Sequence, residues 1–271
     1  METFMFYSYE SCPSVVKQQI AKITNEVSNQ LNGNLLGLYL HGSMVLGGFD
    51  EASSDIDMIG VIKDELSLKE KIALSSLLLS LNKKPRPIDI EFFIKDDFVR
   101  WQGSPASHFY FSDYWIEKYE KIALGGDDAS DLLAVVNPGG EATADFKIAK
   151  ENGVCLYGMP TTKLLPVISD EIFLGFISSG VNQYYVESDN DEQSSFLILQ
   201  LCRILAYKQI REILSKHKAA EWALDTLPSS LHSIIRTALF TKYGFGEKTI
   251  YTKEDALSFK AHMVERINTG D

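Results

Sequence analysis

The sequence predicts an α+β protein with two domains: an N-terminal mixed sheet with flanking helices, and a C-terminal α-helical bundle. Helical and strand-like segments alternate over residues 13–94, which is typical of a sheet covered by helices. Five successive segments after residue 160 have helical spacing only. A chain of 271 residues fits two modest domains. We therefore expect one domain at residues 1–157 and the other at residues 158–271.

The N-terminal elements follow from the spacing of apolar residues. Residues 13–33 have helical spacing and end in Asn-Gly, a typical stop signal. Residues 35–40 form an apolar run of strand length, and residues 54–62 begin with carboxylates and turn apolar, which indicates a second buried strand. Residues 66–81 predict a helix, and residues 88–94 (IDIEFFI) predict a third strand.

The rest of the chain predicts mostly helices. Residues 96–101 indicate a short helix, the aromatic stretch 108–115 a strand or a loop, and residues 142–152 a helix ended by a glycine. In the second domain we expect helices over residues 168–185, 194–214, 218–225, 230–243 and 253–267.

Composition limits the partners. With 26 Lys and Arg against 37 Asp and Glu, the net charge is −11, which disfavours nucleic acid and suits a cationic small molecule. No apolar run approaches the ~20 residues of a membrane span, so we expect no membrane association. The N-terminus has no signal-peptide pattern, so we expect a cytoplasmic protein. We also expect a monomer or a weak dimer.

The three cysteines Cys12, Cys155 and Cys202 are widely spaced. This spacing excludes a disulfide framework and a Cys-x-x-Cys metal site. Apolar neighbours predict that Cys155 and Cys202 are small core residues.

The stretch that indicates chemistry is LHGSMVLGGFDEASSDIDMIGVI, residues 40–62. Asp55 and Asp57 lie two apart at the start of a strand, so both project from one face. Two such close carboxylates repel each other and are usually joined by a cation, and hard oxygen ligands select Mg²⁺. In the preceding turn, Gly42 allows close backbone approach to a phosphate, and Ser43 can donate to a phosphate oxygen.

A further acid on the next strand would complete a catalytic set. Asp89 and Glu91 share one strand face, and either could take a proton from an attacking hydroxyl. Each part has an ordinary structural explanation, because Asp-x-Asp is common at solvated strand ends and Gly-Ser is common in turns. The combination is more specific and predicts metal-assisted transfer of a nucleotidyl group from a nucleoside triphosphate.

These residues resemble the motif of the DNA polymerase β-like nucleotidyltransferase superfamily, and more specifically the streptomycin and spectinomycin 3″/9 adenylyltransferases. In that family a Gly-Ser turn is followed by Gly-Gly and Ser-Asp-Ile-Asp, as at residues 42–43, 47–48 and 54–57 here. Similar segments follow in the family's order over roughly residues 35–243. They are Arg-Pro-Ile-Asp at 86–89, Lys-Glu-Asn-Gly-Val-Cys-Leu-Tyr-Gly at 150–158, Leu-Gln-Leu-Cys-Arg-Ile at 199–204 and Ser-Lys-His-Lys-Ala-Ala-Glu-Trp-Ala-Leu at 215–224.

The resemblance implies a role for each matching residue. Asp55 and Asp57 would bind Mg²⁺, for which we expect two ions, and ATP would be the co-substrate. The nucleotide-binding residues would be Gly42, Ser43, Ser54, Arg203, Lys216 and Tyr243. Arg203 could equally form a structural ion pair, and Tyr243 could equally be a core aromatic.

For the general base, the resemblance favours Asp89. The family has Glu at this position, and Asp is one methylene shorter, so its carboxylate would lie about 1.5 Å further back. Glu91 on the same face is the substitute.

For the substrate, the resemblance implies a cationic, hydroxylated small molecule, an aminoglycoside or aminocyclitol of the streptomycin or spectinomycin class. The candidate contacts are Tyr114, Trp115, Asp189 and Gln193. Gln193 departs from a family carboxylate, and Tyr114 falls where the family has a tryptophan.

Two other acceptors are compatible with the same chemistry: another small molecule, such as a lincosamide or an unknown metabolite, or a macromolecule modified by a toxin. The net charge of −11 disfavours tRNA as that macromolecule. A nucleotide-binding domain without activity is disfavoured because the three carboxylate positions are occupied.

Overall fold

The computed structural model describes residues 5–98, 106–124, 142–180, 192–244 and 251–269. The chain divides into two compact units. We call Tyr7–Ile168 the sheet unit, and Ser169–Asp271 together with Met1–Phe6 the helical unit. The predicted α+β class is confirmed, and the boundary that we expected after residue 157 falls within the last strand of the sheet unit, Val154–Gly158.

The sheet unit holds one mixed five-stranded sheet in the order β4-β3-β2-β1-β5. Its strands are β1 (Leu35–Leu40), β2 (Ile56–Ile62), β3 (Ile88–Ile94), β4 (Phe109–Phe111) and β5 (Val154–Gly158). Strands β2 and β3 are parallel, and the other neighbours are antiparallel. The sequence pattern does not predict β5, which forms one edge of the sheet.

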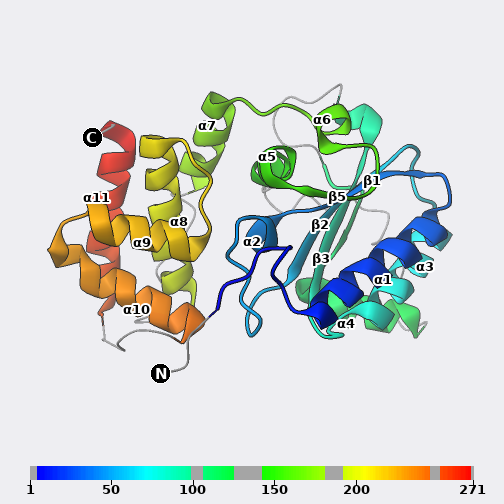
Figure 1. Ribbon diagram of the computed structural model, residues 1–271, viewed down its shortest axis with the longest axis horizontal. Helices are drawn as coiled ribbons and strands as arrows, with labels where there is room; N and C mark the ends of the chain where they lie inside the picture. The colour runs from blue at the N-terminus through cyan, green and yellow to red at the C-terminus, as the bar shows by residue number, and fades with distance from the viewer. Residues whose placement is uncertain (1–4, 99–105, 125–141, 181–191, 245–250, 270–271) are drawn as a thin grey trace. The chain divides into compact units, whose positions relative to one another are not determined.

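Three helices cover one face of the sheet: α1 (Ser14–Leu31), α3 (Leu68–Leu81) and α4 (Ile116–Ala123) (Figure 1). Strand residues at alternate positions of β2 and β3, from Ile56 and Ile88 onward, pack into this core. Helix α3 begins with a full capping box, in which Ser67 and Glu70 satisfy each other's backbone N–H groups.

The opposite face carries the polar residues of the strands. Helix α5 (Ala142–Asn152) covers part of this face, where Phe146 packs on Phe93 of β3 with ring centroids 4.8 Å apart. The alternation of β3 places Asp89 and Glu91 on the same side as Phe93. Short elements complete the unit: α2 (Gly42–Val45), α6 (Thr161–Leu164), and the 3₁₀ turns Lys95–Phe98 and Asp113–Trp115.

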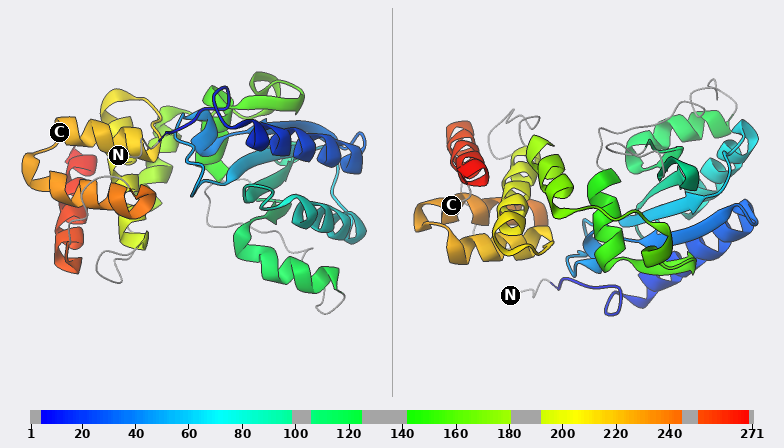
Figure 2. Two further views of the ribbon diagram at one scale, coloured as in Figure 1. Left: turned by 60° about the horizontal axis from the view of Figure 1, so that its bottom comes forward. Right: turned by 90° about the horizontal axis from the view of Figure 1, so that it is seen from above.

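The helical unit contains helices only among its described residues (Figure 2). They are α7 (Asp170–Gly180), α8 (Glu192–Ile210), α9 (Lys216–Thr226), α10 (His232–Tyr243) and α11 (Lys253–Thr269), with a 3₁₀ turn at Ser229–Leu231. Helix α8 is the central helix, since it packs against α9, α10 and α11, and its residues from Leu197 to Leu205 are almost all buried.

Two sequence predictions about local structure need correction or completion. Cys155 is exposed, so its prediction as a core residue was wrong, because the edge strand β5 leaves that side chain uncovered. Cys202 is fully buried in α8, as expected. The aromatic stretch 108–115, for which the sequence allows a strand or a loop, forms β4 followed by the 3₁₀ turn.

Candidate active site

The turn between β1 and β2 encloses a carboxylate. Gly42 begins α2 with φ of +65°, a conformation that favours glycine. A Cβ on Gly42 would lie 1.9 Å from Oδ2 of Asp57, so no other residue fits without moving that carboxylate. The sequence suggested Gly42 for approach to a phosphate, and the structure adds a second reason, which is space for Asp57.

Ser43 connects the turn to the same carboxylate. Its backbone N–H donates to Asp57 Oδ2 at 3.3 Å. Its Oγ is buried and has no hydrogen-bond partner among the described residues. A buried hydroxyl without a partner is costly, and it is available to donate to a bound oxygen ligand.

The acids predicted from the sequence converge at one end of the sheet. In the parallel register of β2 and β3, Asp57 is directly opposite Asp89, so both project from one face. Asp55 immediately precedes β2. Burial raises the pKa of Asp57 well above its usual value, and the charges of Asp55, Asp89 and Asp145 raise it further. This is a concentration of negative charge that a cation would relieve.

The donor set fits Mg²⁺. Within the described residues, no group of three or more His, Cys, Asp or Glu side chains is arranged to hold a metal ion. Mg²⁺ does not need one, because it is commonly held by one or two carboxylates together with water and substrate phosphates. Asp55 and Asp57 stay the carboxylates predicted to supply that pair.

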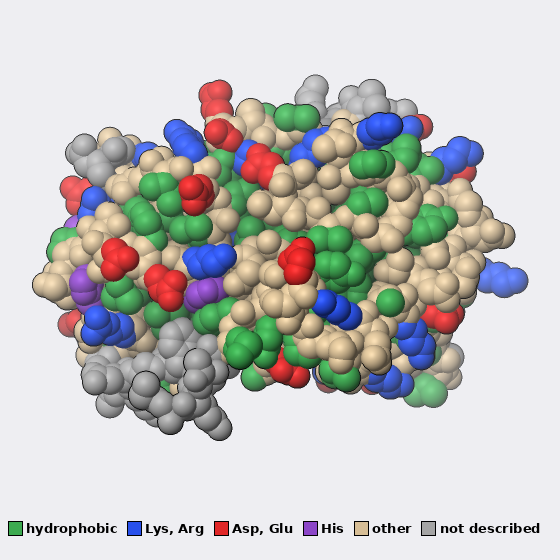
Figure 3. Space-filling view, viewed as in Figure 1, with side chains coloured by type: hydrophobic (Ala, Val, Ile, Leu, Met, Phe, Trp, Pro, Cys, Tyr) green, Lys and Arg blue, Asp and Glu red, His purple; other side chains and the backbone are tan. Residues whose placement is uncertain are grey.

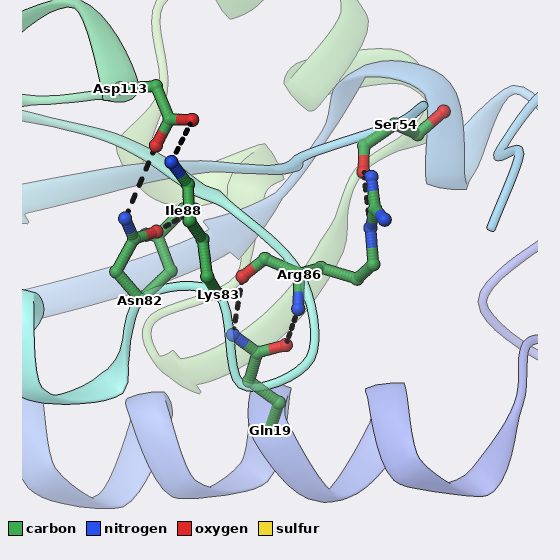
Figure 4. Close-up of polar contacts among 7 residues, drawn as sticks. All are labelled: Gln19, Ser54, Asn82, Lys83, Arg86, Ile88 and Asp113. Atoms are coloured by element: carbon green, nitrogen blue, oxygen red, sulfur yellow. Dashed lines mark hydrogen bonds and ion pairs between the residues drawn. The ribbon is translucent and has the colours of Figure 1, made fainter. Parts of the chain in front are cut away.

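The loop before Asp55 is held by an arginine that the sequence analysis did not select (Figure 4). Nε of Arg86 donates to the Ser54 carbonyl at 2.7 Å, its Nη2 donates to the same oxygen, and its Nη1 donates to the Ala52 carbonyl at 3.3 Å. The backbone of Arg86 is itself fixed by Gln19 of α1, whose amide bonds both its N–H and its C=O. The position of Asp55 therefore depends on contacts from α1 and from the segment before β3.

Ser54, predicted to contact the triphosphate, has a structural contact as well. Its Oγ accepts a hydrogen bond from the Asp50 N–H at 2.9 Å, and the residue is buried. Its hydroxyl hydrogen is not used in that bond, so it can still donate to a ligand.

The two candidate bases occupy different positions along β3. Asp89 is opposite Asp57, whereas Glu91 is opposite Ile59, one residue pair further from the turn. Asp89 Oδ2 accepts a hydrogen bond at 3.0 Å from the hydroxyl of Tyr110 on β4. The register therefore places Asp89, and not Glu91, directly opposite Asp57.

Helix α5 contributes a fourth acid that the sequence analysis missed. Asp145 is close enough to raise the pKa of Asp57, and its Oδ1 lies 3.6 Å from Nδ1 of the buried His41. Burial lowers the pKa of His41 to about 4, so this imidazole is neutral at pH 7. No local motif marks Asp145, because it joins the site only through the packing of α5 on the sheet.

The predicted substrate residues are described in part. Tyr114 is 84% exposed, and Trp115 is half-buried, with its ring 4.9 Å from that of Tyr114. They follow β4 directly, at the end of the sheet where Asp89 lies, because β4 runs antiparallel to β3. Asp189 lies outside the described residues, as does the side chain of Gln193, whose backbone is in the first turn of α8.

The three nucleotide-binding candidates of the helical unit lie around the start of α9. Arg203 donates from Nε to the Leu214 carbonyl at 2.9 Å and so holds the α8–α9 connection. Lys216 begins α9, with its Nζ 4.5 Å above the ring of Phe196. Tyr243 is buried in the helical core, and its ring packs edge-on against the ring of Phe6. The ring of Phe6 in turn stacks on that of His217.

Comparison with known proteins agrees with this geometry. Residues 163–266 match the family model described as "Aminoglycoside adenylyltransferase, C-terminal domain". An aminoglycoside (3″)(9) adenylyltransferase of Escherichia coli is 23% identical over 266 residues, covering 94% of this chain and 96% of that protein. A spectinomycin 9-adenylyltransferase of Campylobacter jejuni is 24% identical over 260 residues, covering 92% and 95%.

The chain is therefore similar to aminoglycoside adenylyltransferases over nearly its whole length. Its fold agrees with this similarity, since it matches a crystal structure of a spectinomycin adenyltransferase from Enterococcus faecalis with ATP and spectinomycin. That match has a TM-score of 0.75 and 22% identity, and it covers 93% of this chain and 99% of the other. The chain thus shares the fold of that enzyme over both the sheet unit and the helical unit.

Proposed function

We propose that the protein transfers AMP from ATP to a hydroxyl of an aminoglycoside or aminocyclitol of the streptomycin or spectinomycin class, releasing pyrophosphate. The observation that carries this proposal is the half-buried Asp57 carboxylate beneath the Gly42–Ser43 turn, beside Asp55 and opposite Asp89. A pair of neighbouring acids beside a Gly-Ser turn, with a third acid in register, is the arrangement that nucleotidyl transfer needs. The relatives named above act on substrates of this class.

The residues divide the chemistry among them. Asp55 and Asp57 would hold Mg²⁺, which supplies charge neutralisation at the phosphates when bound. The Ser43 and Ser54 hydroxyls donate to triphosphate oxygens, and Lys216 of the helical unit stabilises negative charge on the leaving pyrophosphate. Asp89 takes the proton from the attacking hydroxyl, whose oxygen forms the new bond to the α-phosphorus of ATP as the bond to pyrophosphate breaks.

A small cationic acceptor fits the surface. On the face seen in Figure 3, Lys and Arg side chains are interspersed with acidic and hydrophobic ones, and the described residues form no continuous basic area there. Nucleic-acid binding normally requires such an area. None of the described helices is both long and apolar enough to cross a membrane. The expected cytoplasmic location and monomeric or weakly dimeric state stay predictions.

The test is pyrophosphate release with ATP and Mg²⁺ over streptomycin, spectinomycin, other aminoglycosides and lincomycin, with the mass of the product measured. We expect one acceptor to gain an AMP group. Asp55→Asn and Asp57→Asn should each lower turnover by at least about 100-fold while the protein stays folded, because each removes a metal carboxylate.

The matched control is Asp64→Asn, which removes a 71% exposed carboxylate just beyond the other end of β2 and should leave turnover unchanged. Full activity of Asp57→Asn, or no AMP transfer to any acceptor, would contradict the proposal.

A further inference from the structure

Tyr110 is placed to act on the proposed base through the sheet register. In the antiparallel pairing of β3 and β4, Tyr110 is directly opposite Glu91, so Asp89 is its diagonal neighbour on the same face. Diagonal neighbours are within reach of an aromatic side chain. The side chain of Tyr110 spans this distance, and its hydroxyl donates to Asp89 Oδ2 at 3.0 Å.

The backbone around Tyr110 is itself held firmly. The hydroxyl of Tyr119 on α4 donates to the Tyr110 carbonyl, and the ring of Tyr119 stacks on Phe111 with centroids 5.2 Å apart. Phe111 is fully buried in the core beneath α4. The phenol of Tyr110 is therefore presented from a fixed strand, as a positioning group must be.

The direction of the hydrogen bond is also fixed. Burial raises the pKa of Tyr110 far above its usual value, and the charges of Asp89 and Glu91 raise it further. The phenol thus remains protonated and acts as the donor, and the carboxylate of Asp89 is the acceptor.

We propose that Tyr110 is a positioning residue that orients the Asp89 carboxylate for proton abstraction. This inference rests on the proposed function, in which Asp89 is the base. It also gives a physical account of aspartate at a position where the resembling enzymes have glutamate. The shorter side chain has fewer rotatable bonds, and a hydrogen bond to one oxygen fixes the direction of the whole carboxylate.

The experiment compares Tyr110→Phe with the unaltered protein in steady-state pyrophosphate release. We expect kcat to fall by about tenfold or more, because part of the rate enhancement that the general base provides is lost. KM for ATP and for the acceptor should stay nearly unchanged. The control Tyr39→Phe removes another buried hydroxyl of the same sheet, which donates to the Met159 carbonyl at 2.6 Å, and should keep kcat unchanged.

A double-mutant cycle separates positioning from general stabilisation. If Tyr110 acts through Asp89, Tyr110→Phe should cause no further loss in the residual rate of Asp89→Asn. An equal fractional loss in both backgrounds, or an unchanged kcat in Tyr110→Phe alone, would overturn the inference. Absence of AMP transfer by the unaltered protein would instead overturn the proposed function, and this inference with it.

Discussion

At the residue scale, the site is organised around one carboxylate. Asp57 lies under the turn, receives the Ser43 N–H, and leaves no space for a Cβ on Gly42. The sequence identified Asp57, Gly42 and Ser43, because they form a short recognisable pattern. The distance between Gly42 and Asp57 was not predictable, because it depends on how the turn folds back over β2.

The desolvation of the Asp57 carboxylate predicts a pH dependence of stability. Its pKa is raised from the ordinary value of 3.8, so the folded protein holds a proton that the unfolded chain releases at lower pH. The free energy of unfolding should therefore fall as the pH rises from about 4 through the raised pKa, by about 1.4 kcal/mol for each pKa unit.

The Asp57→Asn variant checks this, because asparagine does not ionise. In thermal unfolding without Mg²⁺, we expect it to be more stable than the unaltered protein at pH 8, with a smaller difference at pH 5. A constant difference across that range would show that the charge of Asp57 does not oppose folding.

At the element scale, the site depends on a loop joined to two distant segments. Residues 50–54 are organised by Asp50, whose Oδ2 accepts from the N–H and hydroxyl of Ser53, and are held from outside by Arg86. The sequence marked Arg86 only as part of a resembling segment. Its role became visible when the register of β2 and β3 brought Ile56 beside Ile88, and so Ser54 beside Arg86.

We expect Arg86→Gln to lower the free energy of unfolding by about 1–3 kcal/mol, because the half-buried carbonyl of Ser54 loses two charged donors. It should also raise the Mg²⁺ concentration needed for half-maximal activity, since the loop before Asp55 loosens. Chemical denaturation and Mg²⁺ titrations of the rate measure the two effects.

The capping residue Ser67 offers a matched comparison. Ser67→Ala should cost about 1 kcal/mol of stability through lost helix capping, with no change in the Mg²⁺ requirement. If Arg86→Gln behaved in the same way as Ser67→Ala, the arginine would have a purely structural role.

At the scale of the whole molecule, the chain forms two units, each with its own core. The helical unit also includes the N-terminal residue Phe6, whose ring stacks on His217 with ring centroids 3.7 Å apart. Apolar periodicity predicted both the helical second half and most elements of the first. It could not predict that Phe6 packs against a residue more than 200 positions away in the sequence, because periodicity reports local structure only.

The net charge of −11 predicts how salt affects the reaction. KM for a cationic acceptor such as streptomycin should rise with ionic strength, because screening shortens the Debye length from about 10 Å at 0.1 M to about 3 Å at 1 M. Initial rates over this range, with the salt dependence of KM for ATP as the internal control, measure the effect. A KM for streptomycin independent of salt would exclude a long-range electrostatic contribution.

The sequence by itself determined the α+β class and the helical second half, and it marked Asp55, Asp57 and Asp89 as candidate acids, because periodicity and motif spacing are local properties of the chain. Only the tertiary structure decided that Asp89 rather than Glu91 faces Asp57, that Arg86 and Tyr110 support these acids, and that Asp145 joins them. These contacts depend on strand register and on helix packing across the sheet, where burial and charge act between residues distant in sequence.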